Sequence, residues 1–433
     1  MTDRTDLTIT VASKKGRRRL LFQAIRTGSS ASFPLSPDSE NKLVKLREAL
    51  PKKLQRFHTS IAGLQARDDA AARTKRDNAI AGLRAIGQEF LKAILIEDDD
   101  RPKLDAIMRE AFPLHPTGRA NPGRIDLVVF KRGEMDLLGL PVEILPIMDP
   151  RGVLNIGGPG IPDLEQALLP FPAFSAVVAR RIGAQFDPRT KLERVAGGKI
   201  PVKIIRNPEF HPDDDTSPLI SEVNWLREET ETYEVENPWP EDDVQEKLAT
   251  EMLGVCLLEP RASFAEHRGK RSWADQIQHF SCHYTSQDDG LEVLGIRGEP
   301  TPLNIAVSHL SSLMSDEIQY RRTIPDGLFP GPVIFLNACN SAGVDRHGGL
   351  SIVELLLRET KARAVVATST PVESSLASTF ALAVYEGLKD ALSLGEAVLK
   401  ARWTLVDNKT PFGILYLIYG NPDLRLEPMA RIM

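Results

Sequence analysis

Short apolar runs alternate with helix-like segments along much of this chain, and this alternation limits the folds that it can adopt. Runs with the composition of strands lie at 125–130, 177–179 and 202–205, and a helix-like segment lies near 163–169. Strands that alternate with helices are typical of βαβ units, in which helices cover a parallel sheet. We therefore predict an α/β fold with a central sheet flanked by helices.

The N-terminal part has a different pattern. Residues 7–11 and 19–25 resemble two strands around a basic turn at 14–18, which predicts a hairpin. The turn is expected to be solvated, with polyanion binding as the alternative. Residues 36–112 are helical in pattern, starting from Ser36 as an N-cap before Pro37. We predict helices joined by a loop and packed on the sheet, with docking of a partner as the alternative.

Composition excludes several classes of protein. The chain has 433 residues, which exceeds one ordinary domain, and its net charge of −5 gives no reason to expect a nucleic-acid partner. Three cysteines are too few for a disulfide framework and fit a reducing compartment. No apolar stretch reaches the ~18 residues of a membrane span, and no signal peptide is apparent. We expect a cytoplasmic protein without a membrane anchor.

Two apolar runs end close to a reactive side chain. The run 333–338 leads directly into Cys339, and the run that starts at 277 leads to His283. The carboxyl ends of strands in open α/β sheets are where ligands bind. A thiol is a strong nucleophile as the thiolate, and an imidazole can take its proton and return it. The pair predicts a His–Cys dyad, whereas Cys256, inside an apolar run, is expected to be a small core residue.

Other kinds of site have little support. Cys282 and His283 are adjacent, so on a strand their side chains point to opposite faces and do not share a metal. The chain has no C-x-x-C spacing and no G-x-S-x-G motif, and the glycine run at 155–160 lacks the Lys-Ser/Thr of a phosphate loop. We expect no metal and no cofactor.

Further motifs resemble one known family. After Cys339 come a segment at 348–357, the run V-V-A-T-S-T-P-V-E at 365–373, an E-A pair at 396–397 and Y-G-N-P at 419–422. This succession resembles the CHAT family, caspase-like cysteine peptidases of clan CD that are related to caspases and separase. The resemblance covers about 270–426 well and about 80–230 more weakly, through 140–145 and 201–208. The order of His283 and Cys339, 56 positions apart, agrees with caspases.

The resemblance implies a role for each residue of the dyad. It implies that His283 is the catalytic base and Cys339 the nucleophile, whereas the earlier His279 supports the strand. The family usually has glycine after the catalytic histidine, and this chain has Tyr284. The backbone N–H groups of Tyr284 and Cys339 are the expected oxyanion donors, although the tyrosine puts the shape of the pocket in question.

Three acidic residues are candidates for binding the substrate. The family's pocket for the residue before the cut lies near Glu373, Asp288 and Asp289, and an acid there would favour Arg or Lys. As an alternative, Glu373 caps a helix that starts at 374.

We expect three regions: an N-terminal hairpin and helical region at 1–120, a degenerate caspase-like lobe at 121–246, and a catalytic lobe at 247–433. The acidic stretch 211–246 is expected to contain a helix at 219–226 and otherwise to be an exposed connection, with regulation as the alternative. The resemblance implies a cysteine endopeptidase that cleaves a protein partner, as a bacterial defence or cell-death effector that a separate chain or ligand activates. The alternative is a catalytically silent scaffold that binds peptides or proteins.

Overall fold

The computed structural model describes residues 5–14, 17–64, 67–113, 122–130, 139–148, 164–182, 190–194, 198–206, 218–235, 253, 276–286, 292–297, 303–312, 331–338, 341, 352–358 and 362–428. The chain divides into two compact units. The first contains residues 1–186 and 398–415, and the second contains residues 187–397 and 416–433. The three regions expected from the sequence, 1–120, 121–246 and 247–433, stay a prediction.

The described part of the first unit contains five strands in the order β5-β4-β1-β2-β3. They are β1 (Leu7–Lys14), β2 (Arg17–Ala24), β3 (Ser30–Pro34), β4 (Gly123–Val129) and β5 (Ala176–Ile182). β1 and β2 are antiparallel and confirm the predicted hairpin, whereas β4 lies parallel to both β1 and β5. The strand β3 was not predicted, because its sequence is short and rich in small polar residues.

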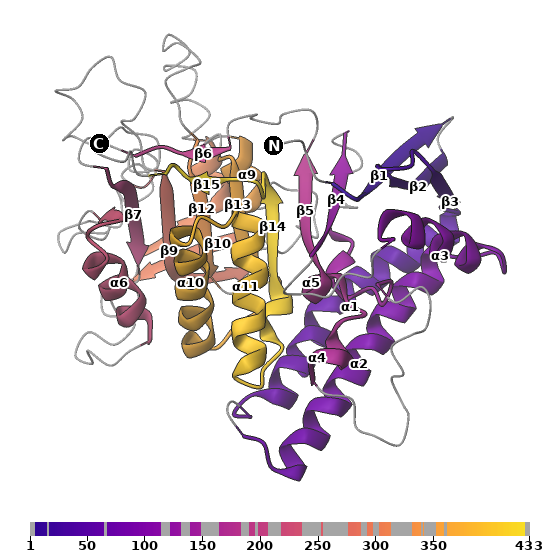
Figure 1. Cartoon of the computed structure of the whole chain (residues 1–433), viewed down its shortest axis with the longest axis horizontal. Helices are drawn as coiled ribbons and strands as arrows, with labels where there is room; N and C mark the ends of the chain where they lie inside the picture. The colour runs from indigo at the N-terminus through magenta and orange to yellow at the C-terminus, as the bar shows by residue number, and fades with distance from the viewer. Residues whose placement is uncertain are drawn as a thin grey trace, which may run out of the picture. The chain divides into compact units, whose positions relative to one another are not determined.

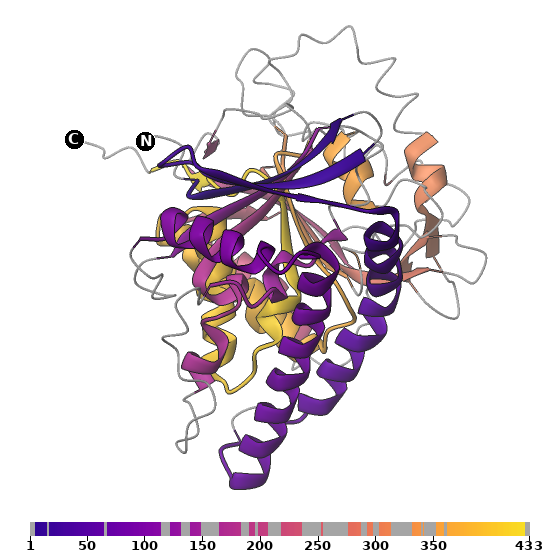
Figure 2. The same ribbon diagram turned by 90° about the vertical axis from the view of Figure 1, so that its right-hand side faces the viewer.

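Three helices of the first unit confirm the helical pattern at 36–112. They are α1 (Pro37–Ile61), α2 (Ala70–Ile94) and α3 (Asp100–Ala111). α1 begins where the sequence predicted, since the Ser36 side chain accepts a hydrogen bond from Ser39 N at 3.1 Å. Figure 2 shows α1 and α2 as a long pair of helices lying side by side. Short helical turns complete this unit: η2 (Val142–Ile144), α4 (Leu164–Leu168), α5 (Pro172–Ser175) and η4 (Phe412–Leu415).

The second unit is built around four parallel strands in the order β7-β9-β12-β13. Their bounds are β7 (Ile200–Arg206), β9 (Ile277–Ser286), β12 (Val333–Ala338) and β13 (Ala364–Thr368). Further strands extend this sheet: β8 (Tyr233–Val235), β10 (Glu292–Arg297), β11 (Leu303–Ala306) and β14 (Tyr416–Gly420). A separate pair joins β6 (Lys191–Leu192) to β15 (Arg425–Leu426). All six residues of β12 are buried, as expected for a strand covered on both faces.

Helices cover both faces of this central sheet. They are α6 (Pro218–Glu228), α9 (Ile352–Arg358) and α10 (Ser374–Lys389), while α11 (Leu394–Asp407) starts in the second unit and continues in the first. α6 packs against α10, and Figure 1 shows α10 in front of the strands. Ile352 and Leu355 of α9 belong to a hydrophobic cluster with Ile334 and Leu336 of β12. The α/β fold class, with a mostly parallel sheet flanked by helices, is therefore confirmed.

The acidic stretch 211–246 needs a correction. The helix expected at 219–226 is present as α6, but residues 233–235 are not an exposed connection, because they form β8 and pair in parallel with β7. The cause is Tyr233, whose side chain is only 2% exposed and anchors this strand in the core. Residues 207–217 and 236–246 lie outside the described residues.

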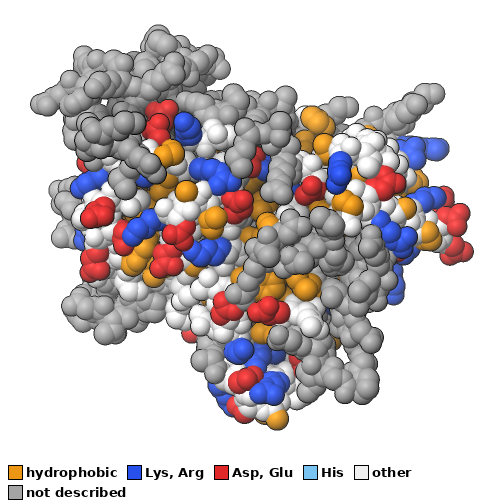
Figure 3. All heavy atoms as spheres, viewed as in Figure 1, with side chains coloured by type: hydrophobic (Ala, Val, Ile, Leu, Met, Phe, Trp, Pro, Cys, Tyr) orange, Lys and Arg blue, Asp and Glu red, His pale blue; other side chains and the backbone are white. Residues whose placement is uncertain are grey.

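The described surface carries charges of both signs. Figure 3 shows Lys and Arg side chains interspersed with Asp and Glu over the described atoms of one face. Mixed charges of this kind keep a surface hydrated and give it no single-sign field. Among the described residues, no helix is long and apolar enough to cross a membrane.

Candidate functional site

The two strands that carry the predicted dyad are neighbours in the second unit. β9 and β12 pair in parallel, with Ser281 opposite Asn337 and Cys282 opposite Ala338. That last described pair directly precedes His283 and Cys339 in the sequence. His283 lies on β9, with its backbone paired to Gly295 of β10. The side chain of His283 and the whole of Cys339 lie outside the described residues.

Hydrogen bonds anchor the chain on both sides of Cys339. The Ala338 carbonyl accepts from Thr368 Oγ1 at 2.7 Å and from Ser341 N at 3.3 Å. Ser341 Oγ donates to the Leu336 carbonyl at 3.2 Å and accepts from Thr368 N at 3.1 Å. Ser341 is fully buried, and Thr368 is only 1% exposed. The hydroxyl of Thr368 therefore serves the backbone and is not presented to a substrate.

A network of buried polar side chains lies on one face of these strands. Glu222 of α6 contacts both strands: its Oε1 lies 3.0 Å from His279 Nε2, and its Oε2 accepts from Asn337 Nδ2 at 3.2 Å. His279 Nδ1 lies 2.7 Å from the Tyr385 hydroxyl, and the Tyr416 hydroxyl donates to Asn337 Oδ1 at 3.0 Å. The network therefore joins α6, β9, β12, α10 and β14.

This network is closed to solvent. His279 and Glu222 are both 0% exposed, and Asn337 is 7% exposed. The His279 ring stacks on Phe335, with 5.5 Å between ring centroids. Burial, followed by the negative charge of Glu222, raises the pKa of Tyr385 well above its ordinary value. Tyr385 therefore keeps its proton, and in the Nε2–H tautomer of His279 it donates to Nδ1 while Nε2–H donates to Glu222.

The opposite face of β9 is apolar. Phe280, Cys282 and Tyr284 alternate with His279 and Ser281 along the strand, and they join the hydrophobic cluster. Cys282 is only 3% exposed, so it packs as a small hydrophobic side chain.

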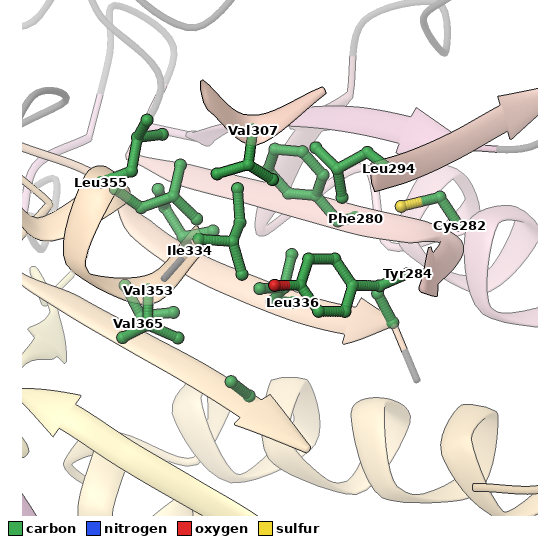
Figure 4. Packing of buried hydrophobic residues seen from close by; sticks show 14 of the residues in the cluster. Phe280, Cys282, Tyr284, Leu294, Val307, Ile334, Leu336, Val353, Leu355 and Val365 are labelled. Carbon is green, nitrogen blue, oxygen red and sulfur yellow. The ribbon is translucent and has the colours of Figure 1, made fainter. Parts of the chain in front are cut away.

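Tyr284, which stands where the CHAT family usually has glycine, does not project into solvent. Its side chain is 4% exposed and lies in the same cluster as Leu336. Figure 4 shows its ring beside Leu336. The bulk of the tyrosine is therefore placed in the core, on the face of β9 away from His279.

The predicted substrate-binding residues have different outcomes. Asp288 and Asp289 lie outside the described residues. Glu373 is exposed at the N-cap position of α10, where its carboxylate accepts from Ser375 Oγ at 3.0 Å. The helix start at 374 is confirmed, whereas the role of Glu373 toward a substrate stays a prediction.

Sequence reasoning missed the residue that connects the network, Glu222. A signal was present, because Glu222 shares a helical face with Val223 and Leu226, which are both buried. An acid among the apolar positions of an amphipathic helix indicates a buried partner. The acidity of the surrounding stretch concealed this signal.

Metal binding finds no support in the part of the chain that the structure describes. There, no group of three or more His, Cys, Asp or Glu side chains is arranged to hold an ion.

Comparisons with known proteins give limited help. No protein family and no curated protein matches this sequence. Two crystal structures of the Saccharomyces cerevisiae separase–securin complex are similar to the chain, with 12% and 11% identity and TM-scores of 0.44 and 0.43. These matches cover 98% and 97% of this chain but only 30% of the other chain in each case. Because both TM-scores are low, neither match carries an argument about the function of this chain.

Proposed function

We propose that this chain is a caspase-like cysteine endopeptidase of the CHAT type, with Cys339 as nucleophile and His283 as base. The observation that supports the proposal is the parallel register of β9 and β12, in which Cys282 lies opposite Ala338. β9 continues into His283, and Cys339 directly follows the last residue of β12. Paired positions of neighbouring strands present their side chains to the same face of a sheet, as a dyad requires.

The chemistry then takes the ordinary course of a thiol protease. His283 removes the proton from Cys339, and the thiolate attacks the carbonyl carbon of the scissile peptide bond. The proton passes to the leaving amine as the C–N bond breaks, and water then hydrolyses the thioester and releases the acid. We propose that the backbone N–H groups of Tyr284 and Cys339 stabilise the oxyanion.

We further propose that the substrate is a protein, with Glu373, Asp288 and Asp289 favouring a basic residue before the cut. Activation by a separate protein or ligand would protect the host from a free peptidase. The biological role that fits is defence or cell death. These steps rest on the resemblance of the sequence and on the register of the strands.

A second candidate, a silent scaffold that binds peptides, is favoured by Tyr284 in place of glycine. The ring of Tyr284 is buried in the hydrophobic cluster, on the face of β9 opposite His279, and this weakens the case for a silent scaffold.

The first prediction tests the nucleophile. Cys339→Ala should abolish cleavage of a protein substrate and leave the melting temperature nearly unchanged, because it removes one sulfur atom from the end of a strand. Cys282→Ala is the matched control: it should lower stability by about 1 kcal/mol through lost packing and should retain activity. Full activity in Cys339→Ala, measured by gel-based cleavage, would contradict the assignment.

A further inference from the structure

One carboxylate joins the two strands of the candidate dyad. Glu222 of α6 forms one hydrogen bond through each carboxylate oxygen. Its Oε1 lies 3.0 Å from His279 Nε2 of β9, and its Oε2 lies 3.2 Å from Asn337 Nδ2 of β12. A single side chain thus holds two strands that are already paired through their backbones.

The joined residues lie close to the dyad in the sequence. Asn337 precedes Cys339 by two positions in the sequence and is the second-last residue of β12. His279 precedes His283 by four positions on the same unbroken strand. A shift of His279 or Asn337 therefore moves the strand segment that directly precedes a residue of the proposed dyad.

The hydrogen bonds of the network pair each donor with an acceptor. Asn337 Nδ2 donates to Glu222 Oε2, and the Nε2–H tautomer of His279 lets the ring donate to Glu222 Oε1. Asn337 then presents its Oδ1 to the Tyr416 hydroxyl, and His279 presents Nδ1 to the Tyr385 hydroxyl. Glu222 thereby fixes the tautomer of one side chain and the amide orientation of the other.

We propose that Glu222 is a positioning residue that sets the alignment of the His283–Cys339 dyad from α6. This inference rests on the proposed function.

Energetic reasoning favours this role over a purely structural one. Burying a charged group is costly, and replacing a buried polar network by apolar side chains often leaves a protein as stable or more stable. The same network gives directional restraint, and a proton transfer between two side chains depends strongly on their alignment. A buried Glu222 is therefore better explained by geometry than by stability.

The test uses the full chain and iodoacetamide, which needs no known substrate. The rate of Cys339 alkylation is followed against pH by mass spectrometry of the peptide that contains Cys339. In the wild type the midpoint of the profile should lie well below the ~8.5 of an ordinary thiol. In Glu222→Ala the midpoint should move by about one unit toward that value, which lowers the rate at low pH about tenfold.

Two further variants make the result specific. Glu222→Gln has the same shape and can form hydrogen bonds with both partners once His279 changes tautomer. Its alkylation midpoint should therefore lie close to that of the wild type. Asn337→Ser breaks the bridge from the other strand and should move the midpoint as Glu222→Ala does. If Glu222→Ala does not fold, the alkylation profile of Asn337→Ser tests the proposal in its place.

Tyr233→Phe is the matched control. It removes a buried hydrogen bond to the Tyr385 carbonyl, 2.9 Å long, in the same unit but outside the bridge. Its melting temperature should fall while its alkylation profile stays that of the wild type.

The two ways of failing are distinguishable. A wild-type midpoint near 8.5 would show that Cys339 is not activated, and the proposed function would fail together with this inference. A lowered wild-type midpoint that is unchanged in folded Glu222→Ala or Asn337→Ser would overturn the role of Glu222 alone. The same holds if Glu222→Gln behaves as Glu222→Ala does.

Discussion

At His279, both ring nitrogens already have partners inside the protein, the Glu222 carboxylate and the Tyr385 hydroxyl. The side chain is 0% exposed, so a substrate cannot reach it without opening the sheet. A general base must come within hydrogen-bond reach of the proton that it removes. The two histidines of β9 should therefore respond differently to substitution.

His283→Ala should lower the rate of cleavage by about 10²–10⁴-fold with little change in melting temperature, because positioned proton transfer is lost. His279→Ala should instead cost about 3 kcal/mol of unfolding free energy, since it leaves Glu222 short of a donor inside the core. Urea unfolding and peptide cleavage, measured on both variants, separate the two effects. A stable His279→Ala protein with complete loss of activity, beside an active His283→Ala protein, would reverse the roles.

Tyr284 gives a second prediction for a single residue. Tyr284→Gly introduces the glycine that is usual in the CHAT family but removes a ring that is 4% exposed, so it should destabilise the protein by about 3–5 kcal/mol. Tyr284→Phe keeps the ring and should cost much less. Thermal unfolding compares the two variants, and equal melting temperatures would show that the ring contributes little to the core.

Among single residues, the sequence predicted where the strands β9 and β12 lie, but not which polar side chains contact them. The apolar run before Cys339 and the run that contains His279 were both recognisable, because fully buried parallel strands are continuously apolar. Glu222 was not, because its partners His279 and Asn337 lie far away in the sequence and meet it only after folding. Long-range polar pairing leaves no periodic signal in a single sequence.

Among the elements, long strands and helices followed their patterns, whereas short strands at the margin of the sheet did not. β8 has only three residues, two of them partly exposed, and β11 has four. Too few residues remain in such strands to show a period of two. The Y-G-N-P motif, in contrast, has a clear structural cause at the end of β14.

Gly420 and Gly82 allow a comparison of the same substitution in two elements. Gly420 has φ +90°, and an added Cβ would lie 2.3 Å from the Arg363 carbonyl oxygen. Gly420→Ala should therefore destabilise the protein by more than about 1 kcal/mol through backbone strain and this clash.

Gly82 lies in the exposed middle of α2, where a Cβ meets nothing within 4 Å. Gly82→Ala should stabilise the protein by up to about 1 kcal/mol, because alanine has the higher helix propensity. Urea unfolding measures the change in unfolding free energy of each variant, which should be a loss for Gly420→Ala and a gain for Gly82→Ala. A neutral Gly420→Ala would mean that β14 ends in a different conformation.

At the scale of the whole molecule, each compact unit is assembled from two separate stretches of sequence. Residues 398–415 return to the first unit, where Arg402 donates to the Ala173 carbonyl and Trp403 donates to the Phe174 carbonyl. Composition along the chain gives no sign of such a return. Boundaries drawn from composition describe successive segments, so they have no means of detecting a unit that is interrupted in sequence.

Both units contain carboxylates whose pKa is lowered by folding. In the first unit, hydrogen bonds from Ala72 N and from Arg67 lower the pKa of Asp69. In the second, burial alone would raise the pKa of Glu396, but hydrogen bonds from Ser393 and the charge of Arg425 outweigh it, so the pKa is lowered. Ser393 and Glu396 form a capping box at the start of α11.

Lowered carboxylate pKa values make the folded protein sensitive to acid. The unfolded chain takes up protons at a higher pH than the folded chain does, so stability should fall as the pH drops from about 5 through the folded pKa values. In Glu396→Gln this fall should be shallower, by less than about 1 kcal/mol, because the carboxylate is partly solvated. Glu386→Gln, at an exposed position of α10, is the control and should follow the wild type. Urea midpoints at neutral and at acid pH measure how far the stability of each variant falls with pH. An equal fall in Glu396→Gln and the wild type would show that the capping box does not contribute to acid sensitivity.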